Sequence, residues 1–120
     1  MSTKNKLAPL RGSQHKLCLA LRRDKAGELF NWTGVRGLRL KLEKWPWNKI
    51  EFFTYREGEV VFVVDTLTGV TVAIGSSQPQ ARANLILLLE QIGSERMRKE
   101  ADELFARINP GPKPPMKPKV

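Results

Sequence analysis

Hydrophobic and polar residues alternate with a period of two in the middle of the chain. Leu38, Leu40 and Leu42 alternate with charged residues, so a strand there would place leucines on one face and charges on the other. Extended patterns return at residues 50–55, 60–64 and 70–74, with glycine-containing turns between them. The run 60–64 is apolar throughout, which predicts a strand covered on both faces. Proline among the residues at 45–48 predicts a turn that interrupts the pattern.

Apolar alternation also occurs earlier, in residues 16–23 and 28–33. A hairpin is the simplest interpretation of these two segments, and it brings the expected number of strands to five or six. Gly34 and Gly37 follow the hairpin and predict a connecting segment before the next strand.

The pattern changes to a helical one after residue 76. Ser77, Pro79 and Gln80 combine a capping hydroxyl, a proline in the first turn and a glutamine three residues after the cap. Apolar residues then recur on one helical face as far as Ile92, and residues 85–89 are apolar almost all round. This helix is therefore expected to be deeply buried or shared with a second subunit. A second, amphipathic helix is predicted over residues 95–108.

Together these elements predict an α+β fold: a twisted antiparallel meander of five or six strands, followed by two C-terminal helices packed on one face. At 120 residues and 41% apolar composition, the chain suits one domain, which we place at 14–109. Residues 1–13 are expected to be a flexible basic arm, and residues 110–120 a disordered tail rich in proline and lysine.

Cysteine content and hydropathy indicate the compartment. The single cysteine cannot form an internal disulfide, nothing resembles a signal peptide, and no apolar run approaches the roughly 20 residues that span a bilayer. We therefore expect a cytoplasmic protein without membrane association.

The net charge of +9 is unevenly distributed. Residues 1–56 hold 13 Lys or Arg against 4 acidic residues, whereas residues 57–109 hold 5 against 8. Such a concentration of positive charge attracts polyanions, among them nucleic acids.

Seven of the nine aromatic residues lie between residues 30 and 56, among these cations. Proteins that hold single strands combine a basic groove for the phosphates with rings on which bases stack. No basic recognition helix is apparent, so single-stranded DNA or RNA is favoured over a duplex, with little sequence specificity. Aromatic residues on strands are more often core residues, and the best candidates for exposed rings are the two tryptophans of the 45–48 turn. The predicted phosphate contacts are Arg36, Arg39, Lys41, Lys44, Lys49 and Arg56, and the predicted stacking residues are Trp45, Trp47 and Tyr55.

The order of elements over residues 50–92, antiparallel strands leading into a capped helix, is similar to that in the Whirly proteins and the transcriptional positive-cofactor proteins. Those proteins bind single strands. The resemblance consists of element order, and it implies no site residue.

Other functional classes have weaker support. His15 and Cys18 are the sole histidine and cysteine, and a nucleophilic pair would need a third group that the sequence does not identify. No zinc or calcium spacing appears, so no catalysis, metal or cofactor is expected, and a metal-dependent nuclease using strand-borne acids is a third interpretation. The main alternative is a small adaptor or regulatory protein that binds a protein partner and dimerises through the 81–92 helix.

Overall fold

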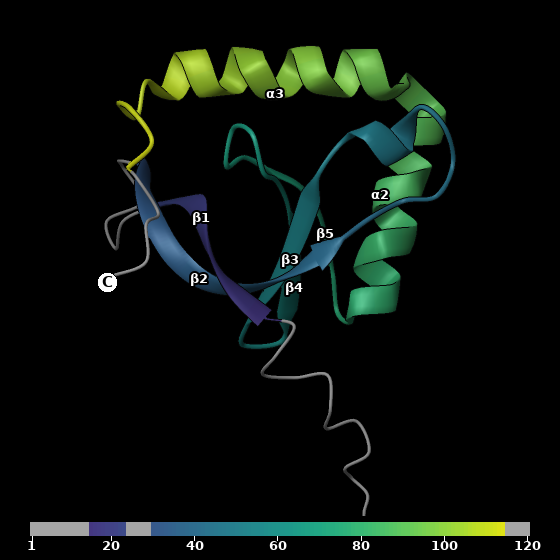
Figure 1. The fold of residues 1–120 in the computed structure, drawn as a ribbon, viewed down its shortest axis with the longest axis horizontal. Helices are drawn as coiled ribbons and strands as arrows, with labels where there is room; N and C mark the ends of the chain where they lie inside the picture. Colours follow the sequence, from purple (N-terminus) through teal and green to yellow (C-terminus); the bar gives the residue numbers. More distant parts are fainter. Residues whose placement is uncertain (1–14, 24–29, 115–120) are drawn as a thin grey trace, which may run out of the picture.

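The computed structural model describes residues 15–23 and 30–114, which form a five-stranded antiparallel sheet followed by two long helices (Figure 1). The strands lie side by side in chain order, so the sheet is a meander, and the predicted α+β fold is confirmed. The elements are β1 (His15–Arg23), β2 (Phe30–Leu40), the 3-10 helix η2 (Trp47–Lys49), β3 (Phe52–Glu57), β4 (Val60–Asp65), β5 (Thr71–Gly75), α2 (Gln78–Ile92) and α3 (Ser94–Ile108).

β2 is one strand where the sequence predicted two strands and a connection. It runs unbroken through Gly34 and Gly37, and the whole of β1 pairs with its residues 30–38. A Cβ at Gly37 would lie 2.8 Å from Phe53 Cδ1 and 2.9 Å from Cys18 Sγ. The glycine at this position therefore serves close packing inside a strand, and its interpretation as part of a connecting segment is wrong.

Both faces of the sheet carry apolar clusters. Val61 and Val63 of β4 belong to the cluster beneath α2, whereas Val64 belongs to a cluster on the other face, with Phe62 packed against it. This arrangement agrees with the prediction that residues 60–64 are covered on both sides. The α2-side cluster contains Leu40, Leu42, Trp47, Phe52, Val61, Val63, Ala81, Leu85, Leu89 and Met97.

The β1–β2 hairpin folds over the neighbouring strands. Ala20 of β1 belongs to the same buried cluster as Tyr55 of β3 and Val64 of β4, although β1 and β4 are not neighbours in the sheet. Figure 1 shows the strong bend of β2 that makes this possible. The Leu21 N–H donates to the Gly69 carbonyl at 2.8 Å, which ties β1 to the turn between β4 and β5.

α2 begins where the sequence predicted. Ser77 Oγ accepts a hydrogen bond from the Gln80 N–H at 3.2 Å, and Pro79 occupies the first turn. Leu85 and Leu89 are buried against the sheet, at 0% and 1% exposure. Within the described part of the chain, no helix is long and apolar enough to cross a membrane.

α3 crosses the end of the sheet (Figure 1). Its Met97 reaches the α2-side cluster, and its Phe105 packs on Trp32 of β2 with the ring centroids 6.1 Å apart. Trp32 Nε1 also donates to the Gly111 carbonyl at 3.3 Å, so the chain returns to β2 after α3. The segment 110–120 is described only as far as Pro114, and the basic arm predicted at 1–13 lies outside the described residues.

Candidate nucleic-acid interface

Three adjoining hollows form one groove on the surface, which we call the basic groove. Their volumes are about 260, 220 and 580 Å³, and Glu51 lines all three. Any two of them share at least one further lining residue, so they adjoin one another. The cationic residues lining the basic groove are Lys16, Arg39, Lys41, Lys49, Arg98 and Lys113, and the acidic ones are Glu51 and Asp65.

These cations come from elements that lie far apart in the sequence. Lys16 lies on β1 and Arg39 on β2, while Lys41 and Lys49 belong to the segment that links β2 to β3. α3 contributes Arg98, and Lys113 lies beyond the end of α3. The groove therefore exists only when the meander has folded and α3 has docked.

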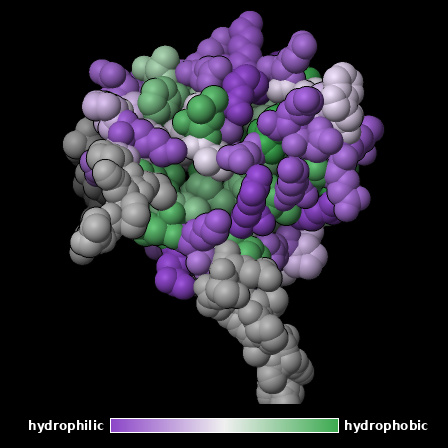
Figure 2. Space-filling view, in the orientation of Figure 1, coloured by the Kyte–Doolittle hydropathy of each residue, from purple (hydrophilic) through white to green (hydrophobic). Residues whose placement is uncertain are grey.

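Glu51 offsets little of this positive charge. Arg39 Nη2 lies 3.2 Å from Glu51 Oε2, and the two side chains are 58% and 61% exposed. An ion pair this exposed contributes about 0–1 kcal/mol, so Arg39 can exchange the carboxylate for a phosphate at small cost. Hydrophilic side chains also cover much of the face shown in Figure 2, with apolar ones gathered toward its centre.

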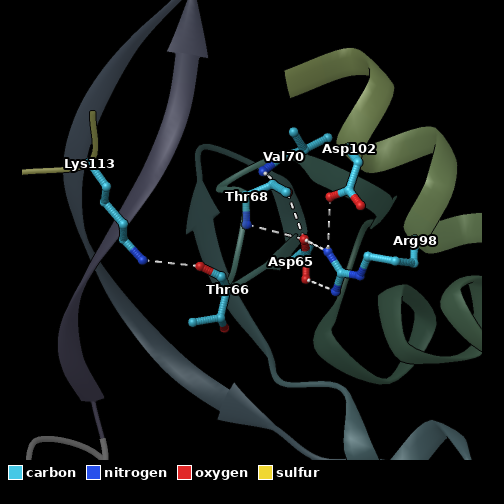
Figure 3. A network of polar contacts seen from close by, with 7 residues as sticks. All are labelled: Asp65, Thr66, Thr68, Val70, Arg98, Asp102 and Lys113. Atoms are coloured by element: carbon cyan, nitrogen blue, oxygen red, sulfur yellow. Dashed lines mark hydrogen bonds and ion pairs between the residues drawn. The ribbon is translucent and has the colours of Figure 1, made fainter. Parts of the chain in front are cut away.

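Asp65 is a buried anchor in the wall of the groove (Figure 3). Its side chain is 1% exposed, and Arg98 binds it with two parallel bonds, Nη1 to Oδ2 and Nη2 to Oδ1, both 2.7 Å long. Thr68 donates to Oδ2 from its hydroxyl at 2.6 Å and from its N–H at 3.2 Å. Both carboxylate oxygens thus have charge-assisted donors, and the hydrogen bond to Asp65 raises the pKa of Arg98.

The chain beyond α3 reaches the same turn. Lys113 Nζ donates to the Thr66 carbonyl at 3.1 Å (Figure 3). The same Nζ lies 5.9 Å from the centroid of the Trp32 ring. Arg98 therefore binds the side chain of Asp65, and Lys113 binds the backbone carbonyl of the next residue, Thr66. Two of the six groove cations are held in place by hydrogen bonds of this turn.

Five of the six predicted phosphate contacts line two separate hollows, while Lys44 lies over the ring of Trp47. Arg39, Lys41 and Lys49 line the basic groove, but Arg36 and Arg56 line a different hollow of about 320 Å³ that shares no lining residue with it. Residues three apart on a strand point to opposite faces, which separates Arg36 from Arg39. The structure therefore does not bring Arg36 and Arg56 together with Arg39, Lys41 and Lys49 in one hollow.

The predicted stacking residues differ in exposure. Trp45 is 68% exposed, whereas Trp47 and Tyr55 are 8% and 6% exposed. Trp47 packs in the α2-side cluster, with Lys44 Nζ 4.8 Å from its ring centroid, and Tyr55 stacks on a neighbouring phenylalanine. Burial also raises the pKa of the Tyr55 hydroxyl. The prediction that Trp47 and Tyr55 are open to a base is wrong, and Trp45 is the exposed ring of the turn.

Three groove cations were not predicted, namely Lys16, Arg98 and Lys113. Arg98 had a signal, because it lies three residues before Ala101 at the edge of the apolar face of α3. A cation in that place can reach a buried acid, and Asp65 ends the most apolar strand pattern of the chain. Lys16 and Lys113 carry no comparable signal, since their contacts are between segments remote in sequence.

The two residues considered for nucleophilic chemistry line different hollows. Cys18 lines the basic groove, whereas His15 lines the hollow of Arg36 and Arg56. Cys18 Sγ donates to the Lys16 carbonyl at 3.5 Å, and burial raises the pKa of its thiol. Among residues 15–23 and 30–114, no three His, Cys, Asp or Glu side chains are grouped so that they could hold a metal ion.

Comparison of the chain with protein-family models, with curated proteins and with solved structures finds no match.

Proposed function

We propose that this protein binds single-stranded DNA or RNA in the basic groove, without catalysis and with little sequence specificity. The observation that carries the proposal is the convergence of six cationic side chains, among the described residues, on three adjoining hollows. Among the described residues two acids line the groove: Asp65 is paired with Arg98, which leaves five cations, and Glu51 is an exposed partner of Arg39. A groove with this charge balance attracts the phosphates of a nucleic acid.

The surroundings of the groove favour a single strand over a duplex. The exposed side of α3 mixes both signs of charge, with Arg96 and Lys99 among three glutamates, so it does not resemble a basic recognition helix. A flexible single strand can adapt to hollows built from several elements, whereas a duplex is stiff over this length. Trp45 offers an exposed ring at the start of the turn that carries Lys49.

The proposal is tested by fluorescence anisotropy with labelled single-stranded and duplex DNA and RNA at several salt concentrations. The affinity for a single strand should fall with salt, with a log–log slope of about −0.7 for each phosphate neutralised. Single strands should bind more tightly than duplexes of the same length. An affinity that does not change with salt, or no binding at low salt, contradicts the proposal.

Two matched charge reversals separate the groove from the overall charge of the protein. Lys41→Glu combined with Lys49→Glu reverses two groove charges, and Arg36→Glu combined with Arg56→Glu reverses two charges in the separate hollow. Both double variants change the net charge by the same amount. The groove variant should lose at least about tenfold in affinity and about 1.4 in the slope, whereas the control should change little. Equal losses would show that binding is not confined to the groove.

A protein partner is the second candidate function, and exposed apolar residues beside α2 support it. Leu87 and Ile74 are 54% and 52% exposed, and Asn84 Nδ2 donates to the Ile74 carbonyl at 2.7 Å, which places β5 next to this side of α2. Sedimentation velocity of the wild type and of Leu87→Lys tests self-association. A dimer that dissociates in the variant supports this candidate, and a wild-type monomer at high concentration argues against a dimer through α2.

A further inference from the structure

We propose that the hollow between β1, β2 and the start of β3 receives one unstacked base of the bound strand. Its apolar wall is formed by Cys18, Leu19 and Phe53, and Lys16, Arg39 and Lys113 are placed to contact the phosphates on either side of that base. The inference rests on the proposed function, because this hollow is one of the three that form the basic groove. It assigns a base-binding subsite to the groove.

The apolar residues that line the hollow are more buried than the cationic ones. Phe53 is 4% exposed and Gly37 is buried, while Cys18 and Leu19 are half-buried. The three cations that line the same hollow are exposed. An apolar floor beneath an exposed cationic rim complements a nucleotide, whose base has apolar faces and whose phosphate is anionic.

The size of the hollow also fits a single base. Pockets for drug-sized ligands measure about 300–1,000 Å³, so a hollow of about 260 Å³ suits one smaller flat group. Gly37 contributes no side chain to it, and a Cβ there would collide with Phe53 and Cys18. The two neighbouring hollows of the groove continue from it past Glu51 and can hold the rest of the strand.

The first experiment compares two oligonucleotides on the unmodified protein. One is an oligothymidylate, and the other is an abasic strand of the same length, which keeps every phosphate and lacks the bases. If a base is bound, the oligothymidylate should bind about 5- to 150-fold more tightly, which is the range for one stacked base. Phosphate contacts alone predict equal affinities.

Cys18 provides a second measurement without any substitution, because it is the only cysteine of the chain. Each oligonucleotide is added at a concentration that saturates the protein by anisotropy, and the rate of thiol labelling by Ellman's reagent is measured. The oligothymidylate should slow labelling about tenfold, since the base covers the thiol, and the abasic strand should slow it much less. Equal protection by both strands would overturn the inference.

Two substitutions at Cys18 complete the test. Cys18→Leu adds bulk to the hollow and should lower the affinity for oligothymidylate more than the affinity for the abasic strand, so that the difference between the two strands shrinks. Cys18→Ala leaves the hollow open and should preserve the difference between the two strands. If Cys18→Leu does not fold, the two measurements on the unmodified protein still decide.

The outcomes distinguish the inference from the proposed function. Equal affinity of the wild type for both strands overturns the base-binding subsite but leaves binding in the basic groove intact. Failure of both strands to bind at low salt overturns the proposed function itself.

Discussion

Replacing Arg98 by methionine should lower the free energy of unfolding by about 3 kcal/mol. The substitution removes two 2.7 Å bonds to the Asp65 carboxylate, whose side chain is 1% exposed. From residues 15–23 and 30–114, the buried carboxylate then keeps the two bonds from Thr68. Removing one partner of a buried ion pair costs about 3–5 kcal/mol. We expect the lower end, because the Arg98 side chain is 28% exposed and water can reach the vacated position.

Arg96 supplies a matched control on the same helix. It forms an ion pair with Glu100 at 2.9 Å, but its side chain is 67% exposed. Arg96→Met should therefore change stability by no more than about 0.5 kcal/mol. Urea denaturation followed by tryptophan fluorescence gives the free energy of unfolding of both variants. The values are compared where the dependence of this free energy on urea concentration, the m value, is unchanged.

A second substitution tests the cause of the loss. Asp65→Asn in the Arg98→Met background removes the uncompensated charge and should restore about 1–2 kcal/mol. If Arg98→Met costs no more than Arg96→Met, or if Asp65→Asn lowers stability further, the reasoning about the buried charge is refuted.

The other predictions concern packing, capping and the thiol. Gly37→Ala should cost about 1–3 kcal/mol in urea denaturation, because its Cβ would overlap Phe53 and Cys18, whereas Gly34→Ala, which meets only the flexible end of a leucine, should cost less. Ser77→Ala removes the cap of α2 and should cost about 1 kcal/mol in the same assay; an unchanged midpoint would contradict this role. Burial raises the pKa of Cys18, so its thiolate fraction at neutral pH is below that of free cysteine. Its labelling rate should therefore be slower than that of glutathione at pH 7 and rise through a higher pH range; equal rates at all pH values would refute the shift.

Local patterns predicted the elements whose structure depends on nearby residues. The alternation at residues 38–42, the extended pattern at 50–55 and the apolar run at 60–64 predicted strands, and the Ser77 cap predicted the start of α2, because each signal lies within one element. The sequence does not predict the continuous β2, because glycine at positions 34 and 37 favours a connecting segment over a strand. A glycine is needed at position 37 because Phe53 and Cys18 pack closely against it. This contact forms only when β1, β2 and β3 lie side by side, so the local sequence does not reveal it.

The candidate site was less predictable than the fold. Trp45 and Trp47 flank the same proline, and nothing in their spacing tells which ring packs on the α2-side cluster. Arg39 was predicted, but its neighbours in the groove include Lys16 and Lys113, which are separated from it by 23 and 74 positions in the numbering. Contacts over such distances depend on the folding of the hairpin and on the path of the chain after α3.

The attachment of α3 to the turn after β4 affects how shortened versions of this protein should be interpreted. A version that stops before residue 98 would lose the guanidinium that holds Asp65, and with it one side of the binding surface. Weaker binding by such a fragment would combine two losses, the support of the turn that holds Asp65 and the groove cations Arg98 and Lys113 themselves. Deletion mapping alone would therefore not separate a lost contact from a lost support.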